Sequence, residues 1–253
     1  GPLRLGHYLK ALRPHQWMKN VLVFLPLLAA HKITDWQLVF NAVQAFLAYG
    51  LCASSVYLLN DLLDLPSDRE HPRKRKRPFA SGAVPISHGV LLIPLLLGAA
   101  IIISLSLPSL FLLVLGGYYL TTLAYSIWLK NKVLVDVIAL AGLYTFRIIA
   151  GAAATAIAPS FWLLAFSMFL FLSLALVKRY SELLVVLQQN KANASGRGYN
   201  VDDLPLLMSL GAASGFLSVL VMALYLNSPD VNTLYGHPQV LWLVLPLLLY
   251  WIS

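Results

Sequence analysis

Long apolar runs alternate with short polar segments along most of the chain. A helix needs about 20 apolar residues to cross the hydrocarbon core of a bilayer, and the runs approach or exceed this length. A membrane β-barrel would instead alternate apolar and polar positions over about ten residues. The pattern therefore predicts an all-α, polytopic transmembrane bundle. Seven spans are expected near 20–31, 39–59, 88–107, 109–128, 133–157, 160–177 and 204–226, and an eighth begins near 239.

The composition agrees with a membrane protein and excludes several other classes. Hydrophobic residues make up 59% of the 253 residues and charged residues 11%, whereas an average soluble domain is about 45–50% apolar and about 25% charged. These figures exclude disorder and a collagen repeat. A disulfide scaffold is excluded because Cys52 is the only cysteine. The last apolar run reaches Ser253 without a polar tail, so we expect a chain truncated at its C-terminus.

The basic residues lie almost entirely at one end of the predicted spans. The formal net charge is +8, and sixteen of the 18 Lys and Arg residues fall in the N-terminal arm or in the loops after the second, fourth and sixth spans. Basic loops stay in the cytoplasm. We therefore predict a multi-pass protein of the bacterial cytoplasmic membrane, whose cytoplasmic parts include the arm (1–19) and two active-site loops (60–87 and 178–203). The charge is explained by topology, so no nucleic-acid partner is predicted.

Three aspartates follow the second predicted span at helical spacing. Asp61, Asp64 and Asp68 are three and four residues apart, which places them on one face of a continuous helix. Like charges at this spacing repel by roughly a few tenths of a kcal/mol per pair, so a bound cation is expected. Oxygen ligands at a partly open site suit Mg²⁺, which keeps waters and bridges to phosphates. Pro66 is expected to kink or end the helix just past Asp64.

A basic run comes soon after the aspartates and contains Lys74, Arg75 and Arg77. Beside a carboxylate–metal cluster, such a run is typical of a phosphate clamp, because arginine makes bidentate contacts to phosphate oxygens. A second interpretation stays open at this point: a positively charged loop that contacts anionic lipid.

The string Asn60-Asp61-x-x-Asp64-x-x-x-Asp68 resembles the first aspartate-rich motif of the UbiA superfamily of intramembrane transferases. The later Lys74-Arg75, Pro78 and Ser81-Gly82 are also similar to that family. The resemblance covers essentially the whole chain as a single domain, residues 1–253. It implies a Mg²⁺-dependent enzyme with a pyrophosphate-bearing donor and a nine-helix all-α fold, of which this chain matches the first eight helices.

Other motifs resemble the branch of this superfamily that transfers phosphoribose to decaprenyl phosphate. After the sixth span the chain has Lys178-Arg179-Tyr180-Ser181-Glu182-Leu183, where aromatic prenyltransferases of the superfamily usually carry a second aspartate-rich motif. Similar matches to the branch are Tyr125-Ser126-x-x-Leu129-Lys130, Asp136 with Arg147-x-x-Ala150-Gly151-Ala152, and Arg13-Pro14-His15-Gln16-Trp17-x-Lys19-Asn20.

Several of these residues also suit a membrane-edge site on physical grounds. Lys130 and Asp136 flank the start of the fifth span. Arg147 lies within that span, where an unpaired charge costs at least about 2.5 kcal/mol. A structural ion pair, or a side chain that extends to the membrane interface, is the alternative explanation for Arg147. Tyr125, Tyr180 and Tyr199 suit stabilisation of a developing positive charge or a hydrogen bond to phosphate, with an interfacial tyrosine belt as the alternative.

Together these features predict a candidate active site in two groups of residues. The predicted catalytic residues are Asp61, Asp64, Asp68, Lys130, Lys178, Arg179, Tyr180 and Glu182, and the three aspartates are also the predicted metal ligands. The predicted substrate- and phosphate-binding residues are Lys19, Asn60, Lys74, Arg75, Arg77, Tyr125, Asp136, Arg147 and Tyr199.

The predicted reaction is Mg²⁺-dependent transfer of phosphoribose from soluble phosphoribosyl pyrophosphate to a membrane lipid, polyprenyl phosphate. One alternative is a prenyltransferase that moves a polyprenyl group from its pyrophosphate to an aromatic or other small acceptor. A CDP-alcohol phosphotransferase is disfavoured because its Asp-Gly-x-x-Ala-Arg pattern does not occur. A transporter or lipid-binding protein would explain the hydropathy and the Arg147 side chain, but not an acidic triad beside a basic run. The sequence carries no signal for the oligomeric state.

Overall fold

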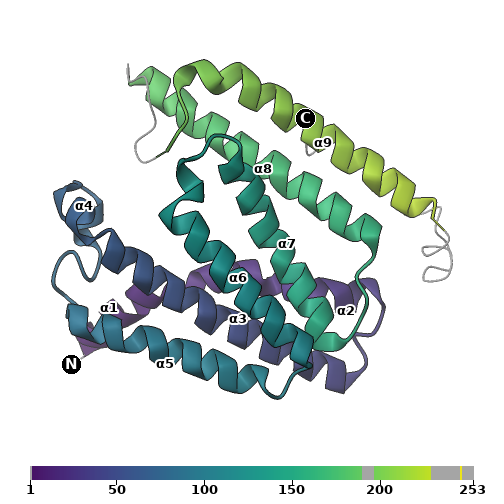
Figure 1. Cartoon of the computed structure of the whole chain (residues 1–253), viewed down its shortest axis with the longest axis horizontal. Coiled ribbons are helices and arrows are strands. Elements are labelled where there is room, and N and C mark those ends of the chain that lie inside the picture. The colour runs from purple at the N-terminus through teal and green to yellow at the C-terminus, as the bar shows by residue number, and fades with distance from the viewer. Residues whose placement is uncertain (1, 190–196, 229–245, 247–253) are drawn as a thin grey trace. The chain divides into compact units, whose positions relative to one another are not determined.

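The computed structural model describes residues 2–189, 197–228 and 246. The regular elements in these residues are helices, as Figure 1 shows, and the predicted all-α class is confirmed. The chain forms two compact units. One comprises Gly1–Leu123 and Ile149–Ile157, and the other comprises Ala124–Ile148 and Ala158–Ser253.

The first unit contains most of the N-terminal half of the chain. Its helices, with 3-10 helices marked η, are α1 (Pro2–Leu12), η1 (Pro14–Phe24), α2 (Leu25–Ala29), α3 (Trp36–Leu63), α4 (Leu65–Glu70), η2 (Lys74–Lys76), α5 (Ile86–Ser104) and most of α6 (Ser109–Ile127). The second unit contains η3 (Leu129–Asn131), most of α7 (Val135–Thr155), α8 (Phe161–Gln188), η4 (Val201–Asp203) and α9 (Leu204–Leu226).

Six helices of the described residues are long and apolar enough to cross a membrane: α3, α5, α6, α7, α8 and the segment Val201–Leu226. They correspond to six of the predicted spans, and α8 continues eleven residues beyond its predicted end at 177. The predicted span at 20–31 is not one of these six helices, because it is not a single long α-helix. Residues 14–29 instead make η1 and the five-residue α2, which has Pro26 in its first turn, where the missing N–H is tolerated. The predicted span near 239 lies outside the described residues.

Tight packing against α3 fixes the course of η1 in the first unit. α3 starts at Trp36 and is capped by Asp35, whose carboxylate accepts hydrogen bonds from the backbone N–H groups of Gln37 and Leu38. The Trp17 ring lies directly over Gly50 of α3, so that no side chain fits there. The Trp17 indole nitrogen donates to Ser54 Oγ at 3.0 Å. This contact holds the N-terminal segment, and with it Arg13, against α3.

In the second unit, α8 and α9 pack side by side along their length (Figure 1). The Ser173 hydroxyl of α8 donates to the carbonyl of Gly211 in α9 at 3.0 Å. A core of six buried residues joins α7, α8, α9 and the segment before η4; these residues are Val137, Ala175, Leu176, Leu183, Tyr199 and Leu207.

Gly151 provides a test of the packing in the first unit. An added Cβ at Gly151 would overlap the backbone carbonyl of Val23, whereas one at Gly142 on the same helix would meet no atom within 4 Å. We expect Gly151→Ala to lower the free energy of unfolding by about 1–3 kcal/mol, because backbone must move to relieve the overlap. Gly142→Ala should be neutral or stabilising, because alanine has the higher helix propensity. Thermal unfolding in detergent measures both, and equal melting temperatures would contradict the packing.

Candidate active site

Two buried carboxylates converge at the end of α3. Asp61 and Asp68 are each only 2% exposed. Arg77 Nη1 lies 2.9 Å from Asp68 Oδ2 and 3.5 Å from Asp61 Oδ1, and Arg13 Nη2 lies 2.7 Å from the same Asp61 oxygen. We call Arg13, Asp61, Asp68 and Arg77 the Asp61 cluster. Both of its carboxylates are compensated by arginine, as buried charges require.

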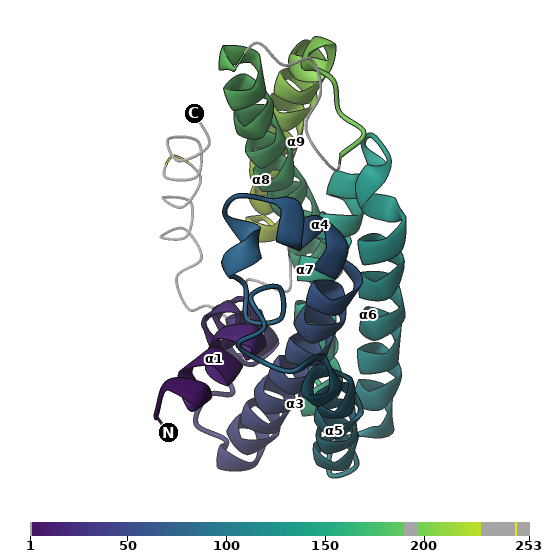
Figure 2. The same cartoon turned by 90° about the vertical axis from the view of Figure 1, so that its left-hand side faces the viewer.

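A break in the helix makes this convergence possible. α3 ends at Leu63, and α4 begins at Leu65 with Pro66 in its first turn, as predicted for a proline at this position. Figure 2 shows α4 at the end of α3. The three aspartates therefore do not share one face of a continuous helix, and this part of the prediction is wrong. Asp64 lies at the junction, where its backbone N–H donates to the Asn60 carbonyl at 2.9 Å.

The geometry of the Asp61 cluster fits a divalent cation that a substrate helps to hold. In the part of the chain that the structure describes, no three His, Cys, Asp or Glu side chains lie close enough to bind a metal by themselves. Asp61 and Asp68 nevertheless both reach one nitrogen of Arg77. Mg²⁺ is commonly held by one or two carboxylates together with substrate phosphates, and two carboxylates with a common approach suit that mode.

The basic run divides into an inner and an outer part. Arg77 points into the Asp61 cluster, whereas Lys74 and Arg75 are exposed. Two residues after Arg77, Phe79 is buried in a core with Ala11, Leu58 and Val84. The outer cations are therefore free of the carboxylates and remain accessible to a solution ligand.

A second charged network lies in the second unit, around the fully buried carboxylate of Asp136. Arg179 donates from Nε to Asp136 Oδ2, from Nη2 to Asp136 Oδ1 at 3.1 Å and from Nη1 to Glu182 at 3.0 Å. The Tyr125 hydroxyl donates to Asp136 Oδ1 at 2.7 Å, and Arg197 Nη1 lies 3.1 Å from the same oxygen. We call these five residues the Asp136 network. Four residues of this network were predicted as site residues, and the structure brings them together.

The segment at 197–199 is held against the start of α7. Gly198 lies so close to the carbonyl of Asn131 that a side chain would overlap it. The Tyr199 hydroxyl accepts a hydrogen bond from the backbone N–H of Leu134 at 3.2 Å. Burial, and then the negative charge of Asp136, raise the pKa of Tyr199 above its usual range. Tyr199 is therefore a neutral anchor of this segment at physiological pH.

The remaining predicted residues of the second unit lie near the network in sequence or inside the bundle. Lys178 is exposed and Lys130 half-buried. Arg147 is 5% exposed; its Nη1 donates to the Leu143 carbonyl at 2.9 Å, and its guanidinium lies 5.2 Å from the centre of the Tyr144 ring. The intramembrane charge of Arg147 thus contacts a carbonyl dipole and an aromatic face, both of which favour a cation.

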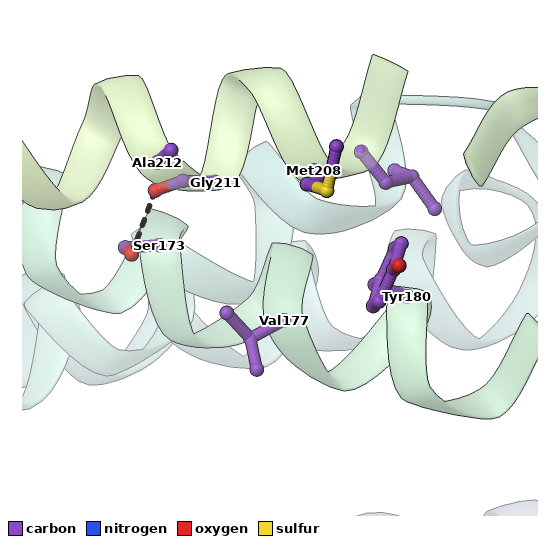
Figure 3. A pocket seen from close by; sticks show the side chains of 7 residues that line it. Ser173, Val177, Tyr180, Met208, Gly211 and Ala212 are labelled. Carbon is purple, nitrogen blue, oxygen red and sulfur yellow. Dashed lines mark hydrogen bonds between the residues drawn. The ribbon is translucent and has the colours of Figure 1, made fainter. Parts of the chain in front are cut away.

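Tyr180 lines a cavity of about 250 Å³ between α8 and α9. Figure 3 shows Tyr180 near one end of this cavity and the Ser173–Gly211 hydrogen bond near the other. In the first unit, Lys19 is an exposed residue of η1 and Asn60 is a half-buried residue in the last turn of α3.

Two arginines of these clusters were not among the predicted site residues. Arg13 entered only as part of a family motif, and Arg197 only as one of the topological charges. The pairing of Arg13 with Asp61 depends on a left-handed backbone at Arg13 (φ 50°) and on the course of η1, which no local pattern indicates. The motif Arg13-Pro14 was the one available signal.

Residues 21–253 match the UbiA prenyltransferase family. The chain belongs to this family. The predicted family is thereby confirmed, and so is its description as a UbiA-family transferase. The six apolar helices and the family together make it a multi-pass integral membrane protein.

Three relatives in sequence have different printed names. The chain is 41% identical over 236 residues to "Uncharacterized protein y4nM" of Sinorhizobium fredii, covering 93% of this chain and 46% of that protein. It is 33% identical to the nodulation protein NoeC of Azorhizobium caulinodans, and the match covers 88% of this chain and 73% of NoeC. It is 40% identical to decaprenyl-phosphate phosphoribosyltransferase of Mycobacterium tuberculosis, and the match covers 69% of this chain and 59% of that protein. The chain thus spans about half the length of two of these relatives.

Among solved structures, a UbiA homologue from Archaeoglobus fulgidus bound to GPP and Mg²⁺ has a similar fold. Its TM-score is 0.76 at 17% sequence identity, and the match covers 97% of this chain and 84% of that one. At this identity the similarity establishes the fold, which agrees with the predicted UbiA-like bundle.

The Asp136 network predicts unequal effects of removing its two carboxylates. Asp136→Asn removes the charge that compensates the buried Arg179 and should cost about 3–5 kcal/mol of unfolding free energy. The Glu182 side chain is 43% exposed, so Glu182→Gln should cost less than about 1 kcal/mol. Melting temperatures in detergent test the order, and an equal or larger loss in the Glu182 variant would contradict it.

Proposed function

We propose that the protein is a Mg²⁺-dependent intramembrane transferase that moves phosphoribose from phosphoribosyl pyrophosphate to a polyprenyl phosphate. The observation that carries the proposal is the convergence of Asp61 and Asp68 on Arg77, beside exposed cations, in a chain of the UbiA family. Paired carboxylates next to free cations suit a pyrophosphate group with its metal.

The choice of phosphoribose rests on the relatives. Identity of 36–40% to four decaprenyl-phosphate phosphoribosyltransferases supports it, and so does the string Lys178-Arg179-Tyr180-Ser181-Glu182 in place of a second aspartate-rich motif. A prenyltransferase is the second candidate, because related folds have been solved with GPP or DMAPP and Mg²⁺. The two candidates use the lipid in opposite roles, as acceptor or as donor.

In the proposed reaction, the bond between C1 of the ribose and the pyrophosphate oxygen breaks, and an oxygen of the lipid phosphate bonds to C1. Bound Mg²⁺ supplies charge neutralisation for the leaving pyrophosphate, with Asp61 and Asp68 as its ligands and Asp64 as the third predicted one. Lys74 and Arg75, exposed beside the Asp61 cluster, hold phosphate oxygens. The lipid phosphate is already anionic near neutral pH, so the chain needs no strong general base.

An apolar cavity of the first unit supports a lipid substrate. An apolar cavity of about 470 Å³ lies between α3, α5 and α6, lined by residues such as Leu97, Leu112 and Tyr119. Apolar walls of this kind suit a polyprenyl chain. Sixteen of the 18 Lys and Arg residues fall on one side of the predicted topology. This supports an active site on the cytoplasmic side of a bacterial cytoplasmic membrane.

A direct test incubates the purified protein in lipid with labelled phosphoribosyl pyrophosphate, polyprenyl phosphate and Mg²⁺. We expect label in the lipid extract, no transfer in EDTA, and loss of at least about 100-fold in Asp61→Ala. Arg69→Gln, which changes an exposed charge on α4, is the matched control and should keep its activity. Transfer from a labelled polyprenyl pyrophosphate to an aromatic acceptor, with none from the sugar donor, would favour the prenyltransferase instead.

Arg77 provides a test of the metal site that does not depend on turnover. Arg77→Gln leaves Asp61 and Asp68 facing each other with one fewer cation, which should cost about 1–3 kcal/mol of unfolding free energy in EDTA. Because Mg²⁺ bound between the carboxylates would replace the lost charge, millimolar Mg²⁺ should raise the melting temperature of this variant more than that of the wild type. An equal response of the two proteins to Mg²⁺ would contradict the assignment of the ligands.

A further inference from the structure

Within the Asp136 network, the buried arginine has no donor left for a ligand. Arg179 Nε donates to Asp136, Nη1 donates to both carboxylate oxygens of Glu182, and Nη2 donates to Asp136 and to the Tyr125 hydroxyl. The side chain is 2% exposed. A guanidinium has five N–H groups, and these contacts engage all three of its nitrogens. Arg179 is therefore suited to hold the network together.

Arg197 is the arginine of this network with unused donors. Only its Nη1 is engaged, at 2.9 Å from the Tyr125 hydroxyl and 3.1 Å from Asp136 Oδ1. Across residues 2–189 and 197–228, Nε and Nη2 have no partner, and the side chain is 27% exposed. These two nitrogens form one edge of the planar guanidinium, the edge that binds two oxygens of a phosphate at once.

The backbone beside Arg197 is fixed before any ligand binds. Gly198 lies against the Asn131 carbonyl, and Tyr199 is buried with its hydroxyl on the Leu134 N–H. Together with the contacts to Asp136 and Tyr125, this anchoring limits the conformations of the guanidinium. A pre-positioned donor loses little entropy on binding.

The charges of the network do not oppose an anion at this edge. Inside the network, the carboxylates of Asp136 and Glu182 are balanced by Arg179 and Arg197. Among the carboxylates that follow in the chain, Asp203 accepts a hydrogen bond from the backbone N–H of Asn200. The network therefore carries no net negative charge that would repel a phosphate.

From this geometry we propose that Arg197 is a substrate-binding residue, which contacts a phosphate oxyanion through Nε and Nη2 while Arg179 positions it through Asp136 and Tyr125. The inference deepens the proposed function and rests on it for the identity of the substrates. The shared chemistry is a phosphate group, carried either by the soluble donor or by the lipid acceptor.

The test compares Arg197→Gln, which removes the charge, with Arg197→Lys, which keeps the charge but loses the bidentate edge. We expect the KM for one phosphorylated substrate to rise about 10- to 100-fold in Arg197→Gln and less in Arg197→Lys, with kcat changed far less. A rise in the KM of the sugar donor assigns the contact to the donor, and a rise for polyprenyl phosphate assigns it to the lipid. Lys132→Gln, an exposed charge that lies over the Trp128 ring, is the matched control.

A binding experiment separates this inference from the proposed reaction. Titration calorimetry measures binding of inorganic pyrophosphate and of geranyl phosphate to the purified wild type and to both Arg197 variants, without turnover. If the wild type binds a probe but transfers no phosphoribose, the proposed function is contradicted. The inference about Arg197 is still supported in that case if Arg197→Gln weakens binding of the probe about tenfold or more. The inference about Arg197 would be overturned if both variants bound both probes as the wild type does, or if the wild type bound neither probe. This holds whatever melting temperatures the variants have.

Discussion

A carboxylate buried at the end of a membrane helix requires a cation, and this requirement organises both clusters of the protein. Asp61 and Asp136 each sit at an end of an apolar helix and are almost fully buried. Each takes its arginines from other segments of the chain: Arg13 and Arg77 in the first case, Arg179 and Arg197 in the second. These ion pairs therefore tie α3 and α7 to other helices and loops of the chain.

The break between α3 and α4 changes which residues Asp68 can contact, compared with a straight helix. In a continuous helix, Asp68 would lie almost two turns, or about 10 Å, beyond Asp61. Because the chain turns at Asp64 and Pro66, Asp68 instead reaches the same arginine nitrogen as Asp61. The two carboxylates therefore share one cation, which the straight-helix spacing would not allow.

Much of this arrangement was predictable because the membrane simplifies the pattern. Apolar length alone located six helices, and Pro66 marked the end of α3. Hydropathy did not indicate the backbone form of the span at 20–31, because residues 14–29 adopt η1 and a short α-helix in place of one long α-helix. Arg13 and Arg197 were missed because each acts on a residue 48 or 61 positions away. Such pairings depend on tertiary packing, which no local pattern encodes.

The contacts of the N-terminal segment bear on where this domain begins. The family match starts at residue 21, yet Trp17 fills the space over Gly50 and Arg13 compensates Asp61. A protein trimmed to the matched region would expose an apolar face of α3 and remove one of the two cations on a buried carboxylate. The structural boundary of the domain therefore lies ahead of residue 21, where the match to the family begins.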